Sequence, residues 1–177
     1  MKNKIIIVVL FSFLVSCNPK KEQDKALELN KSVKVTLTAI VQKNDSFQLF
    51  YKEEDNATKL YDENNSVWID VVASDKPQEI QFLLPENVLP NYLRLDFGVT
   101  EIHKNIKING LNISYLDKKV NINSNTFFDT YFIPNQCIQV EDKATGLIKL
   151  QKDEAGTYDP IFISGENLKF ELQKMYK

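Results

Sequence analysis

The chain has 177 residues, 43% hydrophobic and 26% charged, and its 22 basic and 24 acidic residues give a net charge of −2. This length predicts one domain with a sizeable buried core. The excess of acidic residues argues against nucleic acid as a partner and against a basic face that binds membranes.

The N-terminus has the pattern of an export signal. Lys2 and Lys4 precede an almost unbroken apolar run over residues 5–15. A run of about eleven residues suits the hydrophobic region of a signal peptide and is too short to span a hydrocarbon core of roughly 30 Å. Leu14-Val15-Ser16-Cys17 ends this segment and resembles the lipobox of bacterial lipoproteins.

The lipobox resemblance implies that residues 1–16 are removed and that Cys17 is lipidated. In that family the cysteine thiol receives a diacylglycerol, and the new amine is usually acylated as well. Two or three acyl chains, at about 0.8 kcal/mol per buried CH₂, would anchor the protein stably. We therefore expect a lipoprotein of the cell membrane or outer membrane, periplasmic or surface-exposed. An ordinary secretory signal with a chance cysteine is the alternative.

Residues 17–31 are predicted to form a flexible tether, because residues 18–25 are polar and charged without apolar periodicity. Residues 32–177 are expected to form one domain. Within it, apolar and polar side chains alternate, which is the pattern of half-buried strands. The clearest strands are expected at residues 33–41, 47–51, 66–73, 80–84 and 93–97.

A clear turn signal follows these strands. Residues 106–108 and 111–115 are predicted to form a hairpin around Asn109-Gly110, the strongest short turn signal in the chain. Short strands separated by turn residues predict an all-β fold, a single β-sandwich of the jelly-roll type. Further strands are expected near residues 126–128, 136–140, 147–150, 160–163 and 168–172.

The stretch from Ser46 to Tyr115 contains a series of short apolar segments. They are Phe47-Gln48-Leu49-Phe50-Tyr51, the strand of Trp68, Ile80-Gln81-Phe82-Leu83-Leu84-Pro85, Leu93-Arg94-Leu95-Asp96 and Ile106-Lys107-Ile108. This series resembles the jelly-roll, carbohydrate-binding-module-like domains attached to some bacterial surface-polysaccharide glycosyltransferases and membrane proteins. The resemblance implies a sandwich that serves as a binding module for glycan.

Catalytic motifs are mostly absent from the sequence. His103 is the only histidine, and there is no Gly-x-Ser-x-Gly elbow, no His-Glu-x-x-His and no cysteine cluster. A hydrolytic triad and a zinc site are therefore not expected. We expect a protein that is not an enzyme. A small glycan hydrolase is a third reading, because such an enzyme needs only two carboxylates.

Four residues are candidates for ligand binding: Arg94, Asp96, Trp68 and Tyr61. Arg94 is the only arginine, and at a spacing of two it shares a strand face with Asp96. The pair could bind sugar hydroxyls through the planar guanidinium or, as we favour, form a partly buried pair that holds sheet register. Aromatic rings stack on sugars or fill sandwich cores. We expect Trp68 in the core and Tyr61 near solvent.

No cofactor is expected, except that a structural calcium ion has to be considered. Asp55-Asn56 and the polar segment at residues 61–65 supply oxygen ligands, although without the spacing of an EF-hand loop. A solvated loop is the plainer reading. The sequence thus favours a lipid-anchored envelope module that binds glycan. The alternative is a non-catalytic accessory protein that docks on an envelope protein complex.

Overall fold

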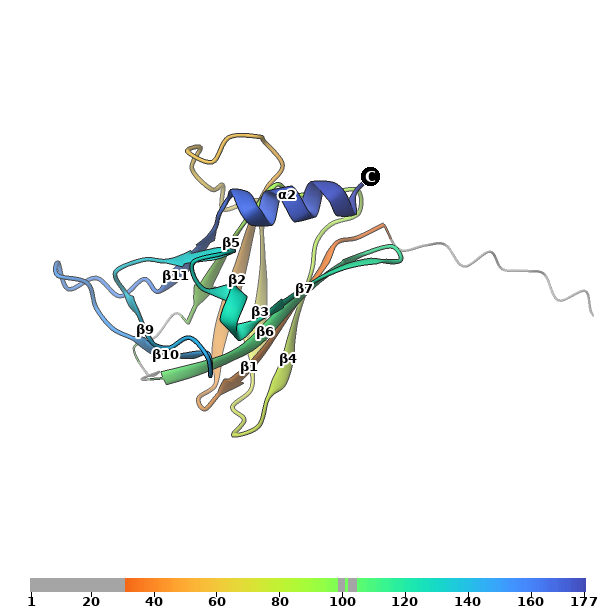
Figure 1. Ribbon diagram of the computed structural model, residues 1–177. Helices are drawn as coiled ribbons and strands as arrows, with labels where there is room; N and C mark the ends of the chain where they lie inside the picture. The colour runs from red at the N-terminus through yellow and green to blue at the C-terminus, as the bar shows by residue number, and fades with distance from the viewer. Residues whose placement is uncertain (1–30, 99–100, 102–104) are drawn as a thin grey trace, which may run out of the picture.

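The computed structural model describes residues 31–98, 101 and 105–177. The signal peptide, Cys17, His103 and nearly all of the tether lie outside these residues. In the described part of the chain, the strands form two antiparallel sheets that pack face to face (Figure 1). This arrangement confirms the predicted all-β sandwich. None of the helices within the described ranges has the length and apolar character needed to cross a membrane.

The first sheet, which we call the β1 sheet, has the strand order β4-β1-β6-β10-β9. The long strand β6 pairs with β1 along one edge, and its other edge is shared between β10 and β7. The strands of this sheet are β1 (Lys34–Val41), β4 (Gln78–Leu83), β6 (Asn105–Tyr115), β7 (Lys118–Asn123), β9 (Ile138–Asp142) and β10 (Leu147–Leu150).

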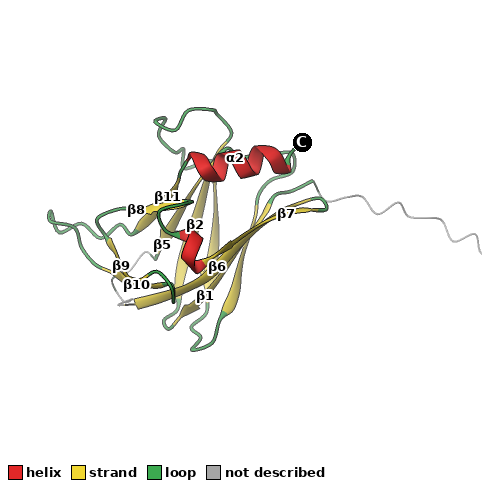
Figure 2. Cartoon of the chain, in the orientation of Figure 1, coloured by secondary structure: helices red, strands yellow, loops and turns green. Residues whose placement is uncertain are grey.

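The second sheet, which we call the β2 sheet, has the order β3-β2-β5-β11-β8. Helix α2 (Glu166–Met175) follows β11 and lies at one end of the sandwich (Figure 2). The strands of this sheet are β2 (Asp45–Lys52), β3 (Ser66–Val71), β5 (Tyr92–Phe97), β8 (Phe132–Pro134) and β11 (Ile161–Ser164).

Alternating side chains bury one face of each sheet. Val35 and Leu37 of β1 point into the core, as do Leu93, Leu95 and Phe97 of β5, and all five are almost fully buried. Because successive strand residues point to opposite faces, the polar residues between them are left on the outer faces. The period-two pattern therefore located these strands correctly.

The predicted hairpin at Asn109-Gly110 is wrong, because both residues lie inside β6. Gly110 and Ile108 pair with consecutive residues of β1, so Asn109 is an extra residue, a β-bulge. Ile108 and Leu111 both face the core although they are three positions apart, and the bulge makes this possible. A Cβ at position 110 would lie 2.7 Å from the carbonyl oxygen of Ile122, so the close approach of β7 requires glycine.

The strand predicted at residues 168–172 is also wrong, because this segment belongs to helix α2. Leu168, Leu172 and Met175 are the buried residues of the helix. Their spacings of four and three place them on one helical face. The apolar spacing of a short amphipathic helix therefore explains the segment better than strand alternation does.

The strand predicted at residues 126–128 is replaced by the single helical turn α1 (Ser124–Phe127). The Asn123 side chain caps this turn by accepting a hydrogen bond from Thr126 N at 3.1 Å. Phe127 is fully buried, and its ring stacks on that of Phe132 with 4.6 Å between centroids. The aromatic residues of this region thus fill the core without forming a regular strand.

Candidate functional site

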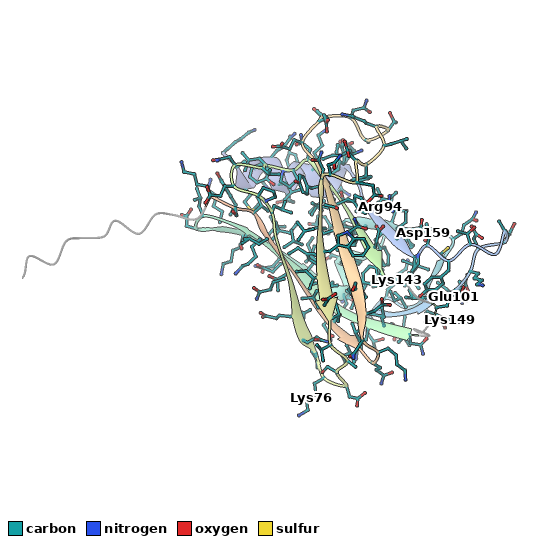
Figure 3. The ribbon with its side chains drawn as sticks, turned by 180° about the vertical axis from the view of Figure 1, so that it is seen from behind. Lys76, Arg94, Glu101, Lys143, Lys149 and Asp159 are labelled. Carbon is teal, nitrogen blue, oxygen red and sulfur yellow. The ribbon has the colours of Figure 1, made fainter. Side chains whose placement is uncertain are left out.

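The outer face of the β2 sheet carries a groove of about 450 Å³, which we call the Trp68 groove. Strands β2, β3 and β5 supply most of its residues. Glu63 comes from the loop before β3, Gly98 follows β5, and Tyr158 and Asp159 precede β11. Figure 3 shows Arg94 and Asp159 on this side of the molecule. The groove is lined by Ser46, Gln48, Phe50, Glu63, Trp68, Arg94, Asp96, Gly98, Tyr158 and Asp159.

Trp68 stands on β3, the outermost strand of the β2 sheet, and 52% of it is exposed. The expectation that Trp68 lies in the core is therefore wrong. The other face of β3 packs on the core through Val67, Ile69 and Val71. Both faces of this strand carry apolar residues, so alternation alone did not decide which face turns inward. The exposed indole can stack on the C–H face of a sugar ring.

Arg94 and Asp96 pair with each other along β5. Arg94 Nε donates to Asp96 Oδ1 at 2.8 Å and Nη2 donates to Oδ2 at 2.5 Å, which is a bidentate ion pair. The Arg94 Cζ lies 4.6 Å from the centroid of the Phe50 ring, in a cation–π contact. The ion pair stays within one strand, and the stack on Phe50 connects Arg94 to the neighbouring strand β2. Because 22% and 16% of the two side chains remain exposed, the pair is mostly buried but still reaches the surface of the groove.

A hydrogen-bond chain orders the polar side chains beside Trp68. Gln48 Nε2 donates to Ser66 Oγ at 2.9 Å and to Glu63 Oε2 at 3.4 Å. Ser66 Oγ in turn donates to the Glu63 carbonyl oxygen at 2.9 Å. The loop before β3 is thereby tied to β2, and the Glu63 carboxylate is held at the groove. Sequence reasoning missed Gln48, Glu63 and Asp159, because they are far apart in the chain and meet only in the folded protein.

The groove is weakly acidic. Among its described lining residues, Arg94 is the only cation, and it faces the carboxylates of Glu63, Asp96 and Asp159. Burial raises the pKa of Asp96 to about 6 against the opposing effect of Arg94, and the charges of Asp159 and Glu63 raise it further. A negative excess of this kind disfavours phosphate, sulfate or carboxylate groups in a ligand.

We expect Asp96 to make the stability of the protein depend on pH. Its pKa is about 6 in the folded protein and near 3.8 in the unfolded chain, so between these values the folded state holds a proton that the unfolded state has lost. Ionisation of Asp96 therefore lowers stability as the pH rises from about 4 to 6, on the order of 2–3 kcal/mol in all. Urea unfolding of the wild type and of Asp96→Asn between pH 4 and 8 measures this. The stability difference between the two proteins should change between pH 4 and 6 and stay level above pH 7; a level difference throughout would refute the prediction.

Tyr158 also lines the groove. Its hydroxyl is buried and has no hydrogen-bond partner among the described residues, and burial raises its pKa to about 12. Cys137 holds the residue before Tyr158: its buried thiol donates to the Thr157 carbonyl oxygen at 3.4 Å. Cys137 therefore serves as a small buried residue behind this side of the groove.

Tyr61, the fourth predicted site residue, lies beside the groove and not in it. Its hydroxyl donates to the Leu93 carbonyl oxygen at 3.1 Å, and its ring centroid lies 6.2 Å from that of Phe50. The ring is half-buried, more than the expected position near solvent, and this burial raises the pKa of Tyr61. Tyr61 thus anchors the loop between β2 and β3 and supports Phe50 beneath Arg94.

The oxygen atoms considered for calcium have other partners: Asp55 pairs with Lys169, Glu63 accepts from Gln48, and Asp62 and Asn56 bond within local turns. Asp62 Oδ1 accepts from Asn64 N at 2.9 Å, and Asn56 Oδ1 accepts from Thr58 N at 3.0 Å. Over the ranges that the structure describes, no group of three or more acidic, histidine or cysteine side chains is placed to hold a metal ion. The geometry of this loop gives no support to a calcium site.

Comparisons with protein-family models, with curated proteins and with solved structures found no match to this chain.

Proposed function

We propose that this protein is a lipid-anchored module of the cell envelope that binds glycan in the Trp68 groove. The observation that carries the proposal is the exposed Trp68 indole in one groove with the bidentate Arg94–Asp96 pair. An aromatic face and fixed polar groups are the two features that sugar rings require. The volume of about 450 Å³ falls within the range of about 300–1,000 Å³ that is typical of ligand sites.

The charges of the groove narrow the ligand to a neutral or amino-bearing sugar. Three carboxylates face one guanidinium, and that guanidinium already donates two hydrogen bonds to Asp96. An acidic polysaccharide would meet net repulsion there. We expect a weak affinity, near the millimolar range, at roughly −4 kcal/mol.

Glycan binding is tested with a glycan array on the purified protein, followed by calorimetry on each hit. Trp68→Ala should weaken binding about fivefold to tenfold, because the stacking surface is lost. Arg94→Lys should keep the charge and the fold but weaken binding, since a lysine lacks the planar fork. Phe170→Ala is the matched control, because Phe170 is an exposed aromatic residue on α2, outside the groove. Equal affinities for the wild type and Trp68→Ala would refute the groove as the binding site.

The anchor is tested separately at Cys17. The Lys2–Lys4 charges, the apolar run and the Leu14–Cys17 motif support lipidation of this residue. Metabolic labelling with a fatty-acid analogue should mark the wild type and leave Cys17→Ala unlabelled. The Cys137→Ala variant is the control and should label like the wild type. Equal labelling of Cys17→Ala would show that the protein is not a lipoprotein of this class.

One observation favours the accessory-protein function as a second candidate. Arg94 pairs in register with Ile163 of β11, and Ile163 pairs with Ile133 of β8. Both isoleucines are exposed on the same face as the Trp68 groove. Exposed apolar side chains next to an arginine are typical of the centre of a protein interface. If no glycan binds and a defined envelope protein binds through this face, docking replaces glycan binding as the function.

A further inference from the structure

The outer face of the β1 sheet carries a second ordered set of polar side chains. The strand register places one residue from each of β4, β1, β6 and β7 in a single row across the sheet. A hollow of about 450 Å³ lies over this row. The residues, in order across the sheet, are Gln81, Thr36, Asn112 and Asn121, and we call them the amide row.

The composition of the amide row is unusual for a solvated strand face. None of its four residues is charged, although 26% of the chain is. Asparagine is depleted in strands, because its side chain competes for backbone hydrogen bonds and packs poorly on a pleated surface. Asn112 and Asn121 are therefore not explained by a contribution to the stability of strands β6 and β7.

One hydrogen bond within the amide row and one to the neighbouring Glu79 orient its amides. Asn112 Nδ2 donates to Asn121 Oδ1 at 2.5 Å, and Gln81 Nε2 donates to Glu79 Oε2 at 3.1 Å. A side-chain amide has two donor hydrogens and an acceptor oxygen with two lone pairs. After these bonds are made, the row still presents both donors and acceptors, which is what the hydroxyls of a sugar need.

The geometry of the sheet suits a linear ligand. Neighbouring strands are about 4.8 Å apart, so a row over four strands extends about 14 Å. Charged residues lie only at the margins of the hollow, where Lys34 and Lys119 are balanced in part by Glu79. A ligand lying along the row would therefore meet neutral hydrogen-bonding groups and no dominant charge.

We infer that the amide row is a second binding surface, which takes an uncharged polysaccharide lying across the strands of the β1 sheet. It is separate from the Trp68 groove, which lies on the outer face of the other sheet. The inference rests on the proposed function for the class of ligand only, because the row, its register and its hydrogen bonds are independent of the groove. A protein with binding surfaces on both sheets would hold a polysaccharide more firmly than either surface alone.

The test is affinity electrophoresis of the purified full chain through gels that contain dextran, glycogen, mannan or a neutral β-glucan, with polygalacturonate as the acidic comparison. The double variant Gln81→Ala/Asn121→Ala removes two exposed amides and should weaken the retardation about tenfold. Asn105→Ala is the matched control, since Asn105 is exposed at the opposite end of β6 and lies outside the row. Circular dichroism checks that each variant keeps its fold.

The outcomes separate the two surfaces. Both binding surfaces are supported if the double variant and Trp68→Ala each weaken binding and their combination weakens it most. If only Trp68→Ala weakens binding, the groove stands and the amide row is overturned. If only the double variant does, the amide row stands and the groove fails. If no neutral polysaccharide retards the wild type, or if Asn105→Ala matches the double variant, the inference is overturned.

Discussion

Phe162→Ala is expected to lower the free energy of unfolding by about 3–5 kcal/mol. Phe162 is fully buried on β11, and its ring centroid lies 5.2 Å from that of Phe127 and 5.7 Å from that of Phe97. Truncation leaves a cavity between rings that come from three elements, and these elements cannot all move to fill it. A loss of this size is a large share of the 5–15 kcal/mol that stabilises an ordinary domain.

Urea unfolding followed by circular dichroism measures this loss, and Ile163→Ala provides the matched control. Ile163 is the next residue on β11 but points to the outer face, where 40% of it is exposed. Its truncation should cost less than about 1 kcal/mol. Similar losses for the two variants would mean that the inner and outer faces of β11 are assigned incorrectly.

Lys52→Met is expected to cost about 2–4 kcal/mol and to loosen the loop between β2 and β3. Lys52 is only 2% exposed, and its Nζ donates to the carbonyl oxygens of Asn56, Ala57 and Lys59 at 3.1, 3.1 and 2.7 Å. Burial lowers the pKa of Lys52. Methionine has a similar length but no donor, so it leaves three carbonyl groups without their shared partner.

The same ammonium group also lies 4.5 Å from the ring centroid of Tyr61 and 5.1 Å from that of Tyr92. The loop that it organises carries Glu63 to the Trp68 groove, and an ion pair between Asp55 and Lys169 ties the loop to α2. Loss of the Lys52 charge should therefore disturb the groove as well as the loop.

Hydrogen exchange over residues 53–65, together with urea unfolding, tests the role of Lys52. Lys59→Met is the matched control, because the Lys59 side chain is 54% exposed and its ion pair with Glu54 lies at the surface. An exposed pair of this kind contributes little stability, so the control should stay within about 1 kcal/mol of the wild type. Unchanged exchange in Lys52→Met would show that the loop is ordered by other contacts.

The predictions from sequence succeeded where one face of a strand is clearly apolar. Leu93, Leu95 and Phe97 alternate with polar residues, and burial of that single face is enough to locate β5. The misplaced elements are those in which a short pattern fits two structures. Asn-Gly suits both a hairpin turn and a β-bulge, and the need to bury both Ile108 and Leu111 in one sheet decided for the bulge.

The candidate site was predicted only in part, for a related reason. Arg94 and Asp96 lie two residues apart on one strand, so their shared face follows from local geometry alone. Their companions in the groove are Gln48, Glu63 and Asp159, which come from other parts of the chain and are brought together by strand order. No local pattern marks such residues as neighbours.

The sequence alone determined the all-β architecture, most of the strands and the shared face of Arg94 and Asp96, because each of these follows from alternation over a few consecutive residues. Only the tertiary structure decided that Trp68 is exposed, that residues 168–172 are helical and that Lys52 is buried beneath a loop. These outcomes depend on which face of a segment meets the rest of the protein, and that choice is made by the packing of the whole domain.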